Sequence, residues 1–231
     1  MVKAGASNII NLLHVTDPHF HKRQLDWVWQ QRHTVDAVCI SGDLLDPSIH
    51  AAPLAEQIGW YQAWLSAWDR PLFVCTGNHD MQEESLASMS LEELFFGSKN
   101  GEDSFTHDFR WLLELKNPNL VRDGEIRKIG KYRIGCIGYE NYQFQRFSKC
   151  DVILTHLPPL GSGVSRDVSW EDFGCGELQF ALQYGVIAPK YLLAGHIHQP
   201  RKSLEQLRDT WLSNPGSSPE GEIPKHRIIS L

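Results

Sequence analysis

The stretch IINLLHVTDPH, residues 9–19, joins an apolar run to a polar cluster. Residues 9–15 are mainly apolar and do not alternate, which is typical of a parallel strand covered on both faces. Pro18 cannot donate a hydrogen bond to a neighbouring strand, so the strand is expected to end there. The stretch therefore predicts a buried strand whose end presents Asp17 and His19.

The same pattern, an apolar run followed by a polar cluster, occurs four more times. The expected strands are residues 37–41, 72–76, 152–155 and 191–194. They lead into Gly42-Asp43-Leu44-Leu45-Asp46, Gly77-Asn78-His79-Asp80, His156 and Gly195-His196-Ile197-His198. Ligand sites in open α/β sheets form beyond the carboxyl ends of the strands. We therefore expect the five clusters to meet at one rim of one sheet, where carboxylates, imidazoles and one amide suit hydrolysis with divalent metals.

The composition is that of a globular protein of 231 residues, which we expect to form one domain over residues 1–231. A net charge of −6 argues against an extended nucleic-acid surface. The five cysteines are odd in number and lack C-x-x-C spacing, so free buried thiols in a reducing compartment are expected. Without a signal core or an apolar run of spanning length, the sequence predicts a cytoplasmic protein with no membrane partner. The oligomeric state stays open.

The order of elements predicts a parallel first half and a strand-rich second half. Helices are expected at 24–32, 53–68 and 177–184, a hairpin at 125–129 and 132–138, and closing strands at 209–213 and 226–230. From this alternation alone we expect a single doubly wound sheet. Residues 81–120 interrupt the pattern as a rim or cap insertion with two short helices, at 91–96 and 108–115. The insertion either overhangs the site or packs on its rim.

The ligand types predict a site for two metals. Asp17 and His19 lie two residues apart, which on a regular strand places both side chains on one side. Asp43 is the candidate to bridge two ions, and Asn78 supplies a neutral oxygen. The remaining imidazoles are those of His156, His196 and His198. Manganese is the expected metal, with Fe, Zn, Co or Ni as alternatives. Such a pair of ions activates a bridging water and holds phosphoryl oxygens.

Two residues are expected to act without binding metal. His79 follows the expected ligand Asn78 and is placed to protonate a leaving alkoxide. Asp46 lies three residues after Asp43 and is expected to accept a hydrogen bond from His79, keeping that ring protonated and oriented.

The ordered set of motifs over residues 17–198 resembles the calcineurin-like metallophosphoesterase superfamily, and most of all its compact bacterial phosphodiesterase-like branch. The resemblance implies an α/β sandwich of two mixed β-sheets packed together and flanked by helices, with a dinuclear site at one edge. We adopt this four-layer fold over the single sheet, because the second half is strand-rich. One metal would be held by Asp17, His19, Asp43 and His198. The other would be held by Asp43, Asn78, His156 and His196.

The motifs leave the substrate open. Protein phosphatases and diadenosine-type hydrolases of the superfamily carry Arg-Gly after the second aspartate, whereas here Asp46 is followed by Pro47-Ser48. The expected function is hydrolysis of a small phosphodiester or nucleotide, with a diester favoured over a monoester. The alternatives are a nuclease or nucleic-acid end processor that uses the same metals, and a non-catalytic interaction scaffold.

Overall fold

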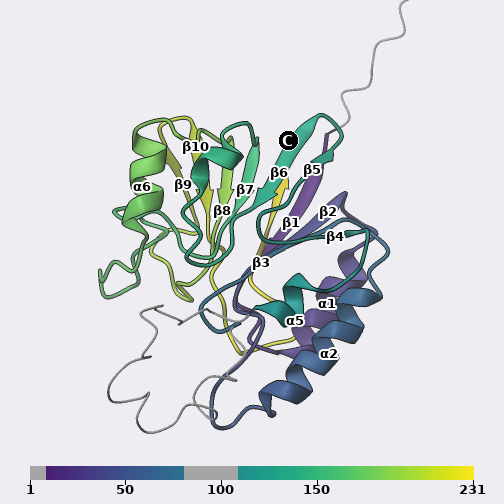
Figure 1. Ribbon diagram of the computed structural model, residues 1–231. Helices are drawn as coiled ribbons and strands as arrows, with labels where there is room; N and C mark the ends of the chain where they lie inside the picture. The colour runs from purple at the N-terminus through teal and green to yellow at the C-terminus, as the bar shows by residue number, and fades with distance from the viewer. Residues whose placement is uncertain (1–8, 81–108) are drawn as a thin grey trace, which may run out of the picture.

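The first four strands and the last strand of the chain form a five-stranded sheet in the computed structural model, which describes residues 9–80 and 109–231 (Figure 1). The strands are β1 (Asn11–Val15), β2 (Ala37–Ser41), β3 (Leu72–Cys75), β4 (Leu120–Val121) and β11 (His226–Ser230), in the order β11-β1-β2-β3-β4. The four strands from β1 to β4 are parallel, and β11 closes the edge antiparallel to β1.

The strands between β4 and β11 form a separate six-stranded sheet. Its strands are β5 (Ile126–Ile129), β6 (Tyr132–Cys136), β7 (Val152–Leu154), β8 (Tyr191–Leu193), β9 (Leu204–Leu207) and β10 (Thr210–Ser213), in the order β5-β6-β7-β8-β10-β9. Two mixed sheets confirm the fold that the resemblance implied. The single doubly wound sheet expected from alternation alone is wrong. Strand β11 covers one edge of the first sheet, and on the other edge β4 pairs over only two residues, so the later strands pair with one another.

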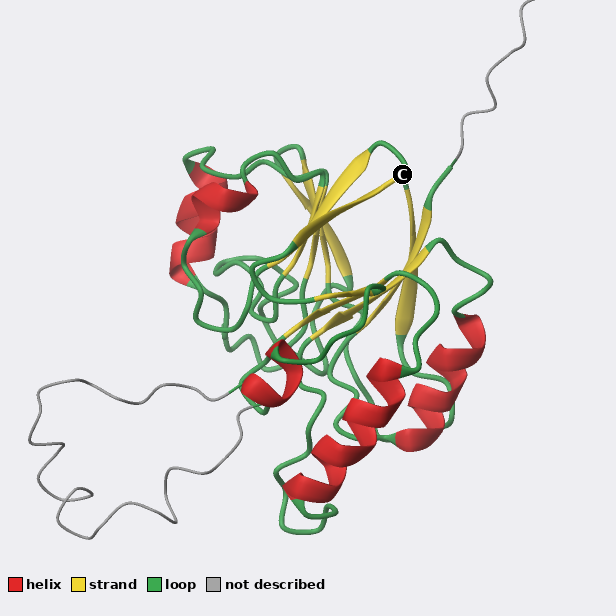
Figure 2. Cartoon of the chain, turned by 45° about the vertical axis from the view of Figure 1, so that its right-hand side comes forward, coloured by secondary structure: helices red, strands yellow, loops and turns green. Residues whose placement is uncertain are grey.

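The two sheets pack face to face between two layers of helices (Figure 2). Helices α1 (Lys22–Gln31), α2 (Leu54–Ser66) and α5 (Arg110–Leu113) cover the five-stranded sheet, and α6 (Gly176–Gln183) covers the other. A short 3₁₀ helix, η1, spans Phe144–Phe147. Alternation along β1 sends Leu12 into the core between the sheets and Leu13 into the core beneath α1 and α2. A fully buried leucine contributes about 1.5–3 kcal/mol, so β1 stabilises two layers at once.

Helix α2 holds the loop that follows β2. Ile58, Tyr61 and Leu65 recur at helical spacing and are buried against the sheet. The Tyr61 hydroxyl donates to the Leu44 carbonyl at 2.8 Å. Farther along the loop, the Gln57 side chain accepts from the Asp46 backbone nitrogen at 2.8 Å and donates to the Asp46 carbonyl at 2.7 Å. The position of the loop that carries Asp43 therefore depends on this helix.

Only part of the expected insertion falls within the described residues. The helix expected at 91–96 lies outside them, and α5 is shorter than the expected helix at 108–115. The Trp111 indole donates to the Asp80 carbonyl at 2.7 Å, which fixes α5 beside the end of β3. All five cysteines are free and buried, as expected. No described helix is both long and apolar enough to span a membrane.

A buried histidine joins the two sheets through hydrogen bonds. His14 of β1 lies 3.0 Å through Nδ1 from the Ser213 hydroxyl in β10. Its Nε2 lies 2.9 Å from the Ser41 hydroxyl in β2. Burial, with a smaller effect of Arg227, lowers the pKa of His14 to about 3. The imidazole is therefore neutral across the physiological range.

We predict that His14 makes the folded state sensitive to acid. Below pH 6.5 its side chain binds a proton in the unfolded chain but not in the folded one, so the free energy of unfolding falls as the pH decreases. The contribution of His14 should fall by about 2.5 kcal/mol between pH 7 and pH 4.5. Urea unfolding at both pH values, with a chelator present, should show this fall reduced in His14→Gln. An equal pH dependence in both proteins would contradict the assignment.

Candidate metal centre

The polar clusters follow the ends of strands, as predicted, but these strands belong to two sheets and not to the one sheet expected from the pattern. Asp17 and His19 follow β1, Asp43 follows β2, and Asn78 and His79 follow β3. The second sheet supplies His156 after β7 and both His196 and His198 after β8. The centre is therefore built from both sheets and lies at the edge where their parallel strands end.

Two groups of side chains have their potential ligand atoms within 4.8 Å of one another: Asp17, His19 and His198 in one group, and Asp43, His156 and His196 in the other. The groups are adjacent, because His19 Nε2 lies 4.0 Å from Asp43 Oδ2. Asn78 belongs beside the second group, since its Oδ1 lies 2.9 Å from His156 Nε2 and 3.0 Å from His196 Nδ1. All seven expected ligands thus converge.

Backbone carbonyls orient two of the imidazoles. The Leu45 carbonyl lies 3.2 Å from His19 Nδ1, and the Ser41 carbonyl lies 2.9 Å from His156 Nδ1. Each carbonyl accepts the proton of Nδ1, which leaves Nε2 directed at other candidate ligands: that of His19 faces His198, and that of His156 lies beside Asn78 and Asp43. The carbonyl fixes both the ring orientation and the nitrogen available to a metal.

Hydrogen bonds also fix the two carboxylates. The His196 backbone nitrogen lies 3.1 Å from both oxygens of Asp17, and the Thr16 hydroxyl donates to Oδ2 of Asp17 at 2.5 Å. The His79 backbone nitrogen donates to Asp43 Oδ1 at 2.9 Å. Both side chains are buried. Each carboxylate is therefore held by the segment that follows a different strand.

Burial and the neighbouring charges together shift the pKa values of the two carboxylates in opposite directions. Burial raises the pKa of Asp17, and the Asp43 carboxylate adds to that shift, while His156 offsets only part of it. Burial also opposes the charge on Asp43, but His156 keeps the pKa of Asp43 well below its usual range. Burial disfavours a charged His156, yet Asp43 and Asp17 outweigh it and raise the pKa of His156 to about 9. Asp43 and His156 therefore form a buried ion pair, 3.3 Å apart.

The donor set fits two divalent cations. Burial lowers the pKa of His196 to about 4 and also lowers that of His198, so both imidazoles are neutral, as metal ligands must be. His19 Nε2 and His198 Nε2 face each other at 3.0 Å, an arrangement that a shared cation satisfies better than a single proton. A second cation would replace the proton of His156 beside Asp43. Imidazole, carboxylate and amide ligands together suit Mn, Fe, Zn or Co.

Four of the candidate ligands adopt a left-handed backbone. The φ angles are 48° at Asp17, 40° at His19, 52° at Asp43 and 69° at His196. This conformation costs about 1–2 kcal/mol for a residue with a Cβ. Hydrogen bonds between the loops offset the cost, since the Asp17 backbone nitrogen donates to the Gly42 carbonyl and that of His19 to the Asp43 carbonyl. Such strain is typical of functional sites.

The glycines before the ligands provide space for neighbouring ligands. A Cβ at Gly77 would overlap the Asp43 side chain and backbone nitrogen. A Cβ at Gly195 would overlap the Thr16 hydroxyl and an Asp17 oxygen. The Gly-Asn-His and Gly-His-x-His spacings therefore reflect close packing of the loops as well as turn geometry.

Asp80 joins two of these loops, a role that the sequence did not reveal. Its Oδ1 accepts hydrogen bonds from the Leu44 and Leu45 backbone nitrogens at 2.6 and 3.0 Å, and its Oδ2 accepts from Gly77 at 2.8 Å. Burial, with a further contribution from Asp43, raises the pKa of Asp80 to about 7. In the sequence, the only indication of this role was the position of Asp80 in the Gly77-Asn78-His79-Asp80 cluster.

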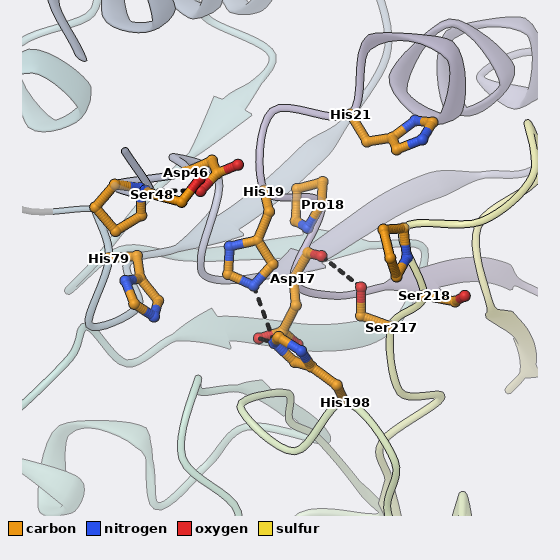
Figure 3. Close-up of a pocket in the computed structure, with 12 residues that line it drawn as sticks. Asp17, Pro18, His19, His21, Asp46, Ser48, His79, His198, Ser217 and Ser218 are labelled. Carbon is orange, nitrogen blue, oxygen red and sulfur yellow. Dashed lines mark hydrogen bonds and ion pairs between the residues drawn. The ribbon is translucent and has the colours of Figure 1, made fainter. Parts of the chain in front are cut away.

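His79 lies beside the ligands in a cavity of about 510 Å³ (Figure 3). Its side chain is 39% exposed, and its Nε2 is 3.8 Å from Asp43 Oδ2. Asp46 lines the same cavity, but its carboxylate accepts from the Ser48 backbone nitrogen at 2.9 Å. Within the described residues it forms no hydrogen bond with His79. The expected contact between the two is absent, because the turn after Asp46 engages its side chain, and a catalytic role for Asp46 stays a prediction.

Comparisons with known proteins give one matching family and several structures of similar fold. A family model described as calcineurin-like phosphoesterase matches residues 10–200. The curated proteins give no match. TT1561 of Thermus thermophilus is similar in structure, with a TM-score of 0.58, 13% identity and coverage of 90% of both chains. A structure described as a novel archaeal phosphodiesterase has a TM-score of 0.45 and 15% identity, and the match covers 96% of this chain and 100% of that one. The likeness to TT1561 supports the fold.

We predict that Gly77→Ala damages the centre, because its methyl group displaces Asp43. The free energy of unfolding should fall by about 1–3 kcal/mol, and the affinity for Mn²⁺ should fall by about 10–100-fold. Gly59→Ala is the matched control, since a Cβ there meets nothing within 4 Å and the site lies inside α2. That change should stabilise the protein by about 0.5–1 kcal/mol. Urea unfolding and calorimetric titration with Mn²⁺ measure both effects, and equal behaviour of the two variants would refute the packing argument.

Proposed function

Because the chain belongs to the calcineurin-like phosphoesterase family, we propose that it is a phosphodiesterase that uses two metal ions to hydrolyse a small phosphodiester. The family implies a metal-dependent phosphoester hydrolase. The observation that carries the proposal is the convergence of two adjacent ligand groups from both sheets, one of which, Asp17, His19 and His198, lines the cavity that contains His79. We propose manganese as the resident metal, and the five free, buried cysteines support a reducing, cytoplasmic compartment.

Each metal ion would have its own group of ligands. Asp17, His19 and His198 would hold one ion, Asn78, His156 and His196 the other, and Asp43 would contact both. When bound, two such ions supply hydroxide at neutral pH and stabilise charge on phosphoryl oxygens. The buried carboxylates and the carbonyl-oriented imidazoles keep this arrangement fixed before the substrate arrives.

His79 is the proposed general acid. It lies in the cavity next to the ligands while its backbone nitrogen is bound to Asp43. Its partly exposed ring lines the cavity, and among the described residues no backbone carbonyl holds it as the Leu45 and Ser41 carbonyls hold His19 and His156. A proton on Nε2 or Nδ1 can pass to the oxygen of the departing group as its bond to phosphorus breaks.

The residues that line the cavity support a phosphodiester, rather than a phosphomonoester, as the substrate. The described residues that line it include Ser48, Ser217, Ser218 and several histidines, but no lysine or arginine. A monoester dianion carries one more negative charge than a diester, and sites that bind it usually provide arginine or lysine. A diester monoanion needs no such partner.

We expect the purified protein with Mn²⁺ to hydrolyse bis-p-nitrophenyl phosphate, and a chelator to abolish the reaction. Asp43→Ala removes the carboxylate shared by both groups, so its affinity for Mn²⁺ should fall on the order of 100-fold or more. Absorbance at the wavelength of p-nitrophenolate and metal analysis after gel filtration are the measurements. The proposal fails if no divalent metal supports hydrolysis in a folded wild-type protein.

His79→Ala should lose turnover while retaining its metals. For a diester with an alkyl leaving group, kcat should fall by about 100–1,000-fold, because an alkoxide needs a proton to depart. The loss should be much smaller for p-nitrophenolate, which leaves without one. Metal analysis of the same samples separates the role of an acid from that of a ligand. An equal loss with both leaving groups, or loss of metal, would remove His79 from this role.

A further inference from the structure

A second cavity, of about 410 Å³, borders the candidate metal centre. Described residues from two segments line it: Asp167, Val168 and Phe173 from the segment between β7 and α6, and His196, Ile197, His198 and Gln199 after β8. His198 also lines the cavity that contains His79. The two cavities therefore meet at a candidate ligand.

The two cavities differ in the kind of apolar group that they present. The cavity of His79 combines serine hydroxyls and imidazoles with the rings of Pro18, Pro47 and Pro219. The second cavity combines the aromatic ring of Phe173 and the branched side chains of Val168 and Ile197 with polar groups such as Asp167 and Gln199. Phe173 is 44% exposed and Val168 is 61% exposed. Two exposed apolar side chains beside metal ligands offer a surface for an apolar or flat group.

The segment that carries Phe173 is held in place by its own hydrogen bonds. The Phe173 backbone nitrogen donates to the Ser165 carbonyl at 3.1 Å, and the Arg201 backbone nitrogen donates to the Arg166 carbonyl at 2.9 Å. The Asp167 carboxylate accepts from the Ser169 backbone nitrogen at 2.8 Å. The apolar wall is therefore formed before any ligand binds, which lowers the entropic cost of binding.

We propose, resting on the phosphodiesterase function above, that the two cavities bind the two arms of the substrate. The leaving group occupies the cavity of His79, because the acid must reach its oxygen. The second cavity binds the ester group that stays on phosphorus and selects an aromatic or apolar group there through Phe173. In the reaction a water oxygen bonds to phosphorus, and the bond to the leaving oxygen breaks with its electron pair. His79 supplies the leaving oxygen with a proton, and the product is a phosphomonoester of the retained arm.

Two diesters that share the same leaving group test the assignment of the second cavity to the retained arm. Phenyl p-nitrophenyl phosphate and methyl p-nitrophenyl phosphate both release p-nitrophenolate, so the ratio of their kcat/KM values reports the retained arm alone. In Phe173→Ala this ratio should fall about 10-fold relative to the wild type, as expected for loss of an apolar contact. Val168→Ala should lower the ratio by a smaller factor in the same direction.

Phe180→Ala is the matched control. Phe180 is 55% exposed on α6, its ring lies against Tyr184, and it lines neither cavity. The ratio should stay at the wild-type value in this variant. Calorimetric titration with phenylphosphonate and methylphosphonate gives a second readout that needs no turnover. Phe173→Ala should weaken only the phenyl compound.

The outcomes separate the two proposals. A wild-type protein that cleaves neither diester with any divalent metal overturns the proposed function. An active enzyme whose ratio and phenylphosphonate affinity are the same in folded Phe173→Ala overturns the assignment of the second cavity and leaves the phosphodiesterase function standing. A ratio lowered equally by Phe180→Ala also overturns it, because the effect would then not come from the cavity.

Discussion

Two buried carboxylates, Asp17 and Asp43, impose the constraint that the rest of this structure satisfies. Transfer of an unpaired carboxylate from water to a protein interior costs several kcal/mol. The chain meets that cost with an ion pair to His156, a pair of bonds from the His196 backbone nitrogen, and a bond from the His79 backbone nitrogen. Compact, left-handed loops bring these groups within reach.

The two-sheet architecture also determines how the metal centre is assembled. The first sheet provides both carboxylates and the second provides three of the imidazoles, so neither sheet holds a complete centre. The core between the sheets, with Leu12, Phe73, Ile134 and Leu193 among its members, aligns the ends of their strands. Packing of the sheets therefore brings the metal ligands together, and apolar burial fixes the geometry of the polar groups.

Local patterns in the sequence were enough to locate most helices and strands and to predict that the ligands lie close together. Strands β2 and β11 have the predicted bounds, and the other predicted strands are shorter in the structure by one or two residues. The division into two sheets needed the family resemblance, because strand pairing depends on which sheet edges are free and not on any local run. Strand β9 was missed, since Glu205 and Gln206 interrupt its apolar residues and it forms as the antiparallel partner of β10. The two-residue strand β4 was also missed, because it is too short to give a pattern. The partners of Asp80 were set by loops that meet only in the fold, whereas Asp46 is engaged by the local turn to Ser48.

The hydrogen bond from the Trp111 indole to the Asp80 carbonyl couples the helical layer to the metal centre. Trp111 is buried with residues of α2, and the Asp80 carboxylate accepts hydrogen bonds from the Leu44 and Leu45 backbone nitrogens in the loop after β2. A substitution among the buried residues around Trp111 therefore perturbs the loop that carries Asp43, although it touches no ligand.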